Sequence, residues 1–465
     1  MDYSKMSVKN FLEGDVDLDR FYSELRNKLN SIESLELVRR KEDVKIEKSG
    51  RLKGLPFFLK DSICSKGDLT QAGSKILKGY KPPFDATVSK RLKEAGGVLM
   101  GKTHQDEFAF GTGSIYCALA TPKNPWDEER CCGGSSGGAA GLAAALDQPM
   151  INLGESTGGS ISEPAAFCGV VGLTPTYGVV SRYGLISYGN SLDKIGPIAR
   201  RVEDVAIGLE IISGKDRMDQ TTVESNGNYS ETREGDISGK TIGLPKQYFE
   251  AAESGVRKRV EEATKEMEEM GAELKEVDLP TTEAALPAYY VIAPAEASTN
   301  LAKYCGMRYG MHEKLEGNFN EYFARVRSEG FGPEVKRRVM LGTYTRMAGY
   351  RDKYYVKALK VRQKIIDDFK RVFKDVDILA GPTAPMVAPE IDELEEMSPV
   401  EQYKLDKLTA PINLAGMPQI SLPCGFSNEM PVGLHLMGDH FQEKKILRTA
   451  RAYEKKRGEI DYPEV

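Results

Sequence analysis

The N-terminal part of the chain has the hydrophobic pattern of an amphipathic helix. Between residues 18 and 32, apolar side chains recur at the three- and four-residue spacing that places them on one helical face. They are Leu18, Phe21, Tyr22, Leu25, Leu29 and Ile32. This face can dock on the body of the same chain, which is the simpler interpretation, or on a partner. The charged residues 39–51 are typical of a linker, so residues 1–50 are predicted to be an N-terminal helical extension and linker.

From residue 54 onward, short apolar segments alternate with helical patterns, which indicates an α/β sheet. Strands are expected at residues 55–61, 98–100, 241–245, 376–382, 418–423 and 433–436. Helices are expected at residues 84–95, 139–147 and 253–271 and through most of 334–374, and a polar surface loop at 225–239. Because strands occur at both ends of this region, we expect one sheet built from both ends and a single domain over residues 51–465.

Composition narrows the class of protein. The 465 residues are 40% apolar and 29% charged, which is typical of a soluble globular protein. No run of about 18 apolar residues predicts a membrane span, and the polar N-terminus does not have the pattern of a secretory signal. The net charge of −5 is spread without blocks, which argues against nucleic acid as the only partner.

The seven cysteines favour reduced thiols in a cytoplasmic protein, because their number is odd and no secretion signal is evident. Adjacent Cys131 and Cys132 do not have the spacing of a metal site, no CxxC or HxxxH pair occurs, and the chain has four histidines. We therefore expect no metal in this chain.

Two glycine-rich loops carry serines: residues 133–138 (GGSSGG) and residues 158–160 (GGS). Ordering glycine is costly, so two such clusters around serines suggest a functional reason. Exposed backbone N–H groups beside a serine hydroxyl suit acyl transfer at a carbonyl. With histidine scarce, a buried lysine is the candidate base. Lys60 ends an apolar strand, where active-site groups of α/β sheets collect.

Two commoner motifs offer alternatives. Residues 96–103 match the phosphate-binding loop GxxxxGK[ST], but a predicted helix precedes them and strand-like residues fall inside the supposed loop. Residues 134–138 match the nucleophile elbow GxSxG, which would make Ser136 the nucleophile and leave His440 as the only plausible histidine. An elbow also requires an apolar strand before it, and residues 128–130 are charged.

The residues around these loops resemble the amidase signature family from about residue 54 to the C-terminus. The resemblance lies in residues 55–61 (LPFFLKD), 133–138, 157–161 (TGGSI) and 164–173 (PAAFCGVVGL). Residues 175–178, 181–186, 293–298, 336–343 and 410–416 resemble one branch of that family, the glutaminase subunits of tRNA-dependent amidotransferases. The resemblance implies a central mixed, twisted sheet covered by helices on both faces.

The resemblance also implies a catalytic triad. Ser160 would be the nucleophile that forms an acyl ester. Ser135, which would follow a cis peptide bond in the chain, would relay the proton, and Lys60 would be the base. The backbone N–H groups of Thr157, Gly158 and Gly159 would form the oxyanion hole. Arg338 would bind the α-carboxylate of glutamine and Asp406 its α-ammonium group, with Tyr289 or Tyr290 lining the pocket.

The chain departs from the family pattern in four places. Ser156 and Ser162 replace the usual aspartate and arginine around the nucleophile, and Glu155 is a candidate substitute for the aspartate. Residues 113–117, including Ile115 and Tyr116, replace a polar segment. Cys131 and Cys132 replace an apolar–proline pair, and the spacing from Ser135 to Ser160 is one residue longer than in the family, an insertion expected within residues 146–150.

The expected function is that of a glutaminase subunit that supplies ammonia for the conversion of Glu-tRNA(Gln) to Gln-tRNA(Gln). It implies partner subunits B and C, which would carry ATP and Mg²⁺, contact with tRNA mainly through the complex, and no cofactor in this chain. The alternatives are a stand-alone amidase of the same family and a scaffold subunit with weakened catalysis.

Overall fold

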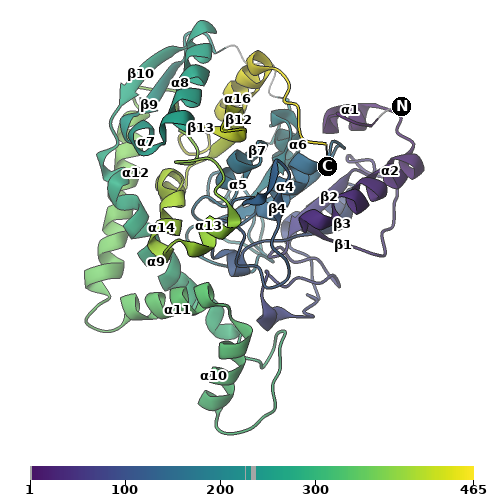
Figure 1. The fold of residues 1–465 in the computed structure, drawn as a ribbon, viewed down its shortest axis with the longest axis vertical. Helices are drawn as coiled ribbons and strands as arrows, with labels where there is room; N and C mark the ends of the chain where they lie inside the picture. Colours follow the sequence, from purple (N-terminus) through teal and green to yellow (C-terminus); the bar gives the residue numbers. More distant parts are fainter. Residues whose placement is uncertain (1–2, 226, 232–236, 465) are drawn as a thin grey trace.

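A mixed sheet of 11 strands runs through the computed structural model, which describes residues 3–225, 227–231 and 237–464. In spatial order the strands are β1 (Val38–Arg40), β3 (Val98–Thr103), β2 (Pro56–Lys60), β6 (Ile151–Ser156), β8 (Lys194–Ala199), β7 (Val171–Thr174), β12 (Gln419–Ser427), β13 (Met430–Met437), β11 (Ile378–Pro382), β9 (Thr241–Pro245) and β10 (Glu273–Val277). Strands from both ends of the chain lie side by side at β7 and β12 (Figure 1), which confirms the prediction of one sheet. A separate hairpin pairs β4 (Lys123–Asn124) with β5 (Asp127–Cys131).

Helices cover both faces of the sheet (Figure 1). The helices of the first half are α1 (Val8–Glu13), α2 (Leu18–Ser31), α3 (Thr87–Glu94), α4 (Gly137–Ala145), α5 (Ser162–Phe167), α6 (Val202–Ile212), α7 (Lys246–Ala251) and α8 (Ser254–Glu269). Those of the second half are α9 (Ala285–Asn300), α10 (Phe319–Gly330), α11 (Pro333–Arg346), α12 (Lys357–Val372), α13 (Ile391–Glu396), α14 (Pro399–Tyr403), α15 (Ala410–Ala415) and α16 (Glu443–Arg457). The predicted strands and helices therefore exist, with bounds shifted by a few residues.

The N-terminal helix α2 docks on the body of its own chain. Its residues Phe21, Tyr22 and Leu25 are buried, and the Tyr22 hydroxyl donates a hydrogen bond of 2.7 Å to the carbonyl of Gly54. The predicted linker is wrong at Arg39 and Arg40, which belong to β1 and pair with β3, because an edge strand tolerates charged side chains on its solvent side. The domain boundary at residue 50 remains a prediction, and the predicted loop 225–239 lies partly outside the described residues.

The small residues of α4 allow that helix to lie directly against neighbouring backbone. A Cβ atom at Gly138 would lie 2.4 Å from the carbonyl oxygen of Leu37 and 2.6 Å from that of His104. No larger residue fits without moving backbone, so the glycine-rich sequence is explained here by close packing of the segment that follows Ser136.

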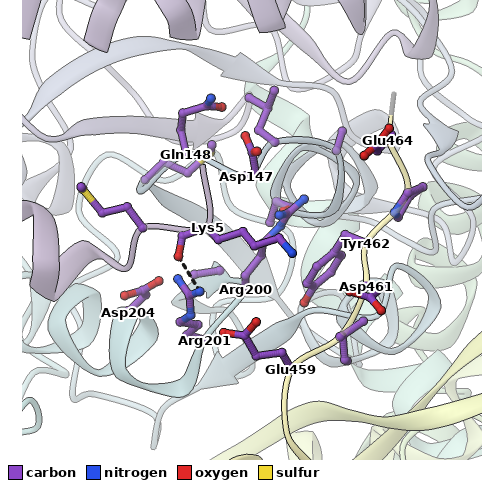
Figure 2. Close-up of a pocket in the computed structure, with 18 of the residues that line it drawn as sticks. Lys5, Asp147, Gln148, Arg200, Arg201, Asp204, Glu459, Asp461, Tyr462 and Glu464 are labelled. Carbon is purple, nitrogen blue, oxygen red and sulfur yellow. Dashed lines mark hydrogen bonds between the residues drawn. The ribbon is translucent and has the colours of Figure 1, made fainter. Parts of the chain in front are cut away.

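The two ends of the chain meet around a cavity of about 720 Å³ (Figure 2). Its lining includes Lys5, Asp204 and the C-terminal tail at Tyr462. The Arg200 guanidinium lies 4.0 Å from the centre of the Tyr462 ring and donates hydrogen bonds to the carbonyls of Ala143 and Ala144. None of the predicted site residues lines this cavity.

Candidate active site

The site lies at the carboxyl ends of two parallel strands. Strands β2 and β6 are parallel and pair with Leu59 opposite Leu153. Their carboxyl ends therefore lie together, and Lys60 and Glu155 lie at these ends. Both side chains are buried, and Lys60 is 0% exposed. The apolar pattern of residues 55–61 thus carries an amino group into the interior, where it must be paired.

Lys60 contacts the first of the two adjacent serines. Its Nζ atom lies 2.7 Å from Ser135 Oγ, and the peptide bond between Gly134 and Ser135 is cis, as the family resemblance implies. Gly134 fits against Asp106, since a Cβ atom there would lie 2.3 Å from Asp106 Oδ2. The Asp106 backbone N–H also donates to the carbonyl of Ser135, which fixes the loop in place.

Glu155 supplies the other partners of Lys60. The Nζ atom lies 3.0 Å from the Glu155 carbonyl oxygen and 3.0 Å from its carboxylate Oε2. Burial lowers the pKa of Lys60 below its ordinary value, and the Glu155 carboxylate opposes that shift. Burial thus favours the neutral amine, and a neutral amine can accept a proton from a neighbouring hydroxyl.

The second glycine loop follows β6 directly. Within the described part of the chain, no group accepts a hydrogen bond from the backbone N–H of Thr157, Gly158 or Gly159. Ser160 is 6% exposed, and helix α5 begins just after it, with Glu163 N–H donating to the carbonyl of Gly159. The loop therefore presents backbone donors beside a hydroxyl, which is the requirement for stabilising an oxyanion.

Asp406 and Arg338 come together beside this loop through Tyr290. The Tyr290 hydroxyl donates a 2.7 Å hydrogen bond to Asp406 Oδ2, and its ring stacks on Tyr403 at 3.8 Å between centroids. The Arg338 guanidinium lies 5.2 Å from the centre of each of these rings. A Cβ atom at Gly159 would lie 3.1 Å from Asp406 Oδ1, so the carboxyl is adjacent to the loop.

The sequence leaves open whether Tyr289 or Tyr290 lies in the site, and both contact Asp406 or the adjacent glycine loop. Tyr290 holds Asp406, and Tyr289 packs on the loop, where a Cβ atom at Gly158 would lie 2.5 Å from its Cζ. Burial raises the pKa of Asp406 to about 6.

Several groups in the site have no counterpart among the predicted residues. Glu334 Oε1 lies 2.6 Å from Arg338 Nε, and the Tyr188 hydroxyl lies 2.7 Å from another guanidinium nitrogen of the same arginine. Glu334 precedes Arg338 by one helical turn, and that spacing could have identified the pair from the sequence. Asp193 Oδ1 lies 2.8 Å from Thr157 Oγ1 in the second glycine loop. Tyr188 and Asp193 carry no such local signal, because the fold alone brings them here.

The departures from the family pattern have local explanations. The hydroxyls of Ser156 and Ser162 donate to the side-chain oxygens of Asn413 and Gln419, at 3.4 and 3.2 Å. The Glu155 carboxylate lies against Lys60, and its substitution for the family's aspartate remains a prediction. Residues 146–150, where the extra residue is expected, connect α4 and β6 without helix or strand.

The remaining substituted positions are also placed. The Tyr116 hydroxyl donates to Gln402 Oε1 at 2.8 Å, and its backbone N–H donates to Asp106. Ile115 packs beside the apolar cluster that contains buried Cys131. All seven cysteines are free thiols.

The geometry argues against both alternative motifs. Ser136 Oγ lies 3.0 Å from the carbonyl oxygen of Glu155 and accepts from that residue's N–H, so it ties α4 to β6. His440 contacts the carbonyl of Ala415. Lys102 and Thr103 lie within β3, where Lys102 donates to the carbonyl of Ile63, so residues 96–103 do not form a phosphate loop.

Neither a metal cluster nor a membrane helix is evident in the part of the chain that the structure describes. Among residues 3–225, 227–231 and 237–464, no three His, Cys, Asp or Glu side chains are grouped so that they could hold a metal ion. No helix in these ranges is long and apolar enough to cross a membrane.

Known proteins with similar sequences and structures have the amidase fold. The sequence pattern of the amidase family matches residues 24–447. The A subunit of the glutamyl-tRNA(Gln) amidotransferase from Halothermothrix orenii is 50% identical over 443 residues, which cover 94% of this chain and 92% of that protein. The crystal structure of the corresponding A subunit from Thermotoga maritima has a TM-score of 0.86 and 40% identity, covering 100% of this chain and 99% of that one.

A more distant structure is that of a peptide amidase. The enzyme from Stenotrophomonas maltophilia has a TM-score of 0.81 and 26% identity, with 99% of each chain covered. The sheet order, the cis peptide before Ser135 and these similarities lead to one conclusion: the chain belongs to the amidase family.

Proposed function

We propose that this chain is the glutamine-hydrolysing subunit of a tRNA-dependent amidotransferase. The observation that carries the proposal is the contact between Lys60 and Ser135 at a cis peptide, beside a loop with free backbone donors and the cluster in which Tyr290 contacts both Arg338 and Asp406. The relatives at about half identity over most of the chain carry the name of that subunit, which supports the choice of glutamine over other amides.

In the proposed reaction, Ser160 Oγ attacks the side-chain amide carbonyl of glutamine. Its proton passes to Ser135, whose own proton passes to Lys60, so the lysine becomes the ammonium form. The carbonyl oxygen takes the negative charge and accepts hydrogen bonds from the N–H groups of the loop. Losing one such donor typically costs about 100- to 1000-fold in rate.

Collapse of the tetrahedral intermediate breaks the carbon–nitrogen bond. Ser135 gives its proton to the leaving nitrogen and regains one from Lys60, so ammonia departs and the γ-glutamyl ester remains on Ser160. Water then repeats the sequence in place of Ser160 and releases glutamate. A hydroxyl between base and nucleophile suits this role, since it can accept and donate in the same position.

Arg338 and Asp406 are proposed to select glutamine by its two α-substituents. The guanidinium would bind the α-carboxylate through paired N–H donors, and the Asp406 carboxylate would bind the α-ammonium group. Tyr290 touches both charges, so it fixes their separation.

The released ammonia is proposed to serve partner subunits B and C, which would hold ATP, Mg²⁺ and tRNA-bound glutamate. The family's glutaminase branch implies this division of work, and the complex would act in the cytoplasm.

Replacement of serines in the purified complex tests the proposal. Ser160→Ala should abolish ammonia release from glutamine, and Ser135→Ala should reduce it by at least about 1000-fold. Ser136→Ala is the matched control on the same loop. It should keep activity within about tenfold, because Ser136 only joins α4 to β6. Ammonia release at the wild-type rate by Ser160→Ala would refute the assignment.

Two other functions would give different results. A stand-alone amidase, favoured by the likeness to the peptide amidase, would hydrolyse other amides without partners. A scaffold subunit with weakened catalysis would bind subunits B and C but release little ammonia.

A further inference from the structure

Glu155 occupies two of the three hydrogen-bonding positions around Lys60. Its carbonyl oxygen and its carboxylate Oε2 each lie 3.0 Å from Nζ, and Ser135 Oγ takes the third position at 2.7 Å. Since the side chains of Lys60 and Glu155 are 0% and 2% exposed, water does not compete for these contacts. Glu155 therefore leaves Lys60 one direction in which to exchange a proton, and that direction is toward Ser135.

The same three partners satisfy Lys60 in both protonation states. An ammonium group has three N–H donors, which match the Glu155 carbonyl, the Glu155 carboxylate and Ser135 Oγ. A neutral amine has two N–H donors and one lone pair. Its donors can remain on Glu155 while the lone pair accepts the Ser135 hydroxyl. Only the Lys60–Ser135 hydrogen bond has to reverse.

The second carboxylate oxygen of Glu155 is tied to another acid. Thr157 Oγ1 lies 2.8 Å from Glu155 Oε1 and 2.8 Å from Asp193 Oδ1. One hydroxyl hydrogen makes a full hydrogen bond to only one of these acceptors, and a proton on one of the two carboxyls would complete the chain. Burial, aided by the nearby Glu155 charge, raises the pKa of Asp193 to about 8, which places that proton on Asp193. Thr157 then donates to Glu155, whose negative charge is left for Lys60.

We propose that Glu155 is a positioning residue for the base: its carboxylate aims Lys60 at Ser135 and balances the charge that Lys60 gains when it takes the Ser135 proton. This inference rests on the proposed role of Lys60. In the step itself, the Ser135 O–H bond breaks, an Nζ–H bond forms, and the new ammonium faces an existing carboxylate. No other reactant is required.

The charged groups around the pair determine the direction of the expected pH effect. Lys60 interacts electrostatically with Glu155 on β6, with Asp106 beside the Gly134 loop and with Asp193 before β8, and Asp193 contributes no charge while it holds its proton. Lys194 on β8 interacts electrostatically with both Glu155 and Asp193. Removing the Glu155 charge leaves burial less opposed, so the neutral, active form of Lys60 should persist to lower pH.

The test is Glu155→Gln in the complex with subunits B and C. Glutamine keeps an acceptor oxygen for Lys60 but removes the charge. We expect the acid limb of kcat/KM to move to lower pH by at least about one unit, with the plateau reduced less than tenfold. The rate of inactivation by phenylmethanesulfonyl fluoride should show the same shift, because that reagent reports Ser160 attack without glutamine. Asp204→Asn, which changes a buried carboxyl that binds Val8 N–H, is the matched control and should keep the wild-type limb.

Glu155→Asp is the second variant, for the case that Glu155→Gln does not fold. Aspartate keeps the charge, but its shorter side chain does not extend as far toward Lys60. The plateau of kcat/KM should therefore fall, while the acid limb of the pH profile moves by less than one unit. A folded Glu155→Gln with an unmoved limb in both assays would overturn the inference, as would Glu155→Asp with an unchanged plateau. Failure of the wild-type complex to hydrolyse glutamine would refute the proposed function instead, and the inactivation assay would still decide the role of Glu155.

Discussion

Asp406→Asn offers a quantitative test of the glutamine pocket. The carboxyl is 5% exposed, receives a 2.7 Å hydrogen bond from Tyr290 and lies beside Gly159. The substitution keeps the shape of the side chain and removes its charge. A hydrogen bond to a charged partner contributes about 1.5–3 kcal/mol, so KM for glutamine should rise roughly 10- to 150-fold. The value of kcat should change little, because the α-ammonium group is bound equally before and during the reaction.

Two measurements isolate this interaction. The first compares glutamine with glutaramate, which lacks the α-amino group, as substrates of the complex. Wild type should prefer glutamine by the factor that Asp406→Asn loses, and the variant should not discriminate between them. The second is the pH dependence of KM. Because the pKa of Asp406 is raised to about 6, KM should rise as the pH falls through about 6, and this rise should be absent in Asp406→Asn.

A variant that still prefers glutamine to glutaramate by the wild-type factor would show that Asp406 does not bind the α-ammonium group. A large fall in kcat with unchanged KM would also contradict this role, since that result would place Asp406 in the chemical step.

The second glycine loop and the N-terminal helix α2 each depend on close packing at one residue. Gly159→Ala should lower kcat at least about 100-fold in a folded protein, because its Cβ would lie 2.2 Å from Thr409 Oγ1 and would displace the backbone donors. Steady-state kinetics measure the loss, and a circular dichroism spectrum checks that the variant is folded. Activity near wild type would argue against the proposed oxyanion hole. Phe21→Ala should lower the free energy of unfolding by about 3–5 kcal/mol, since this ring is 0% exposed and packs against Tyr3, Phe11 and Tyr22. Denaturant unfolding measures this change. A change below about 1 kcal/mol would show that α2 contributes little to the core.

The fold could be predicted where the hydrophobic pattern is local. The apolar residues 55–61 and 98–100 predicted β2 and β3, and the alternation at both ends predicted one sheet. The register of β1 could not be predicted, because Arg39 and Arg40 are charged and their pairing with β3 depends on an edge formed by distant residues.

In the candidate site, too, only residues with a local sequence signal could be predicted from the sequence. Lys60 was identifiable as a lysine at the end of an apolar strand, while the roles of Ser135, Arg338 and Asp406 came only from the family resemblance. The contact of Glu155 with Lys60 had no sequence signal, since it requires β2 and β6 to be neighbours in parallel register. Tyr188 and Asp193 precede β8, and only the fold brings them to Arg338 and Thr157.

Trapping the acyl-enzyme identifies which serine attacks glutamine. The complex would be mixed with glutamine, quenched in acid within one turnover and digested for peptide mass spectrometry. A γ-glutamyl ester is expected on Ser160 and should be absent from Ser160→Ala. An ester on Ser135 or Ser136, or ammonia release with no ester on Ser160, would contradict the assignment of Ser160 as the nucleophile.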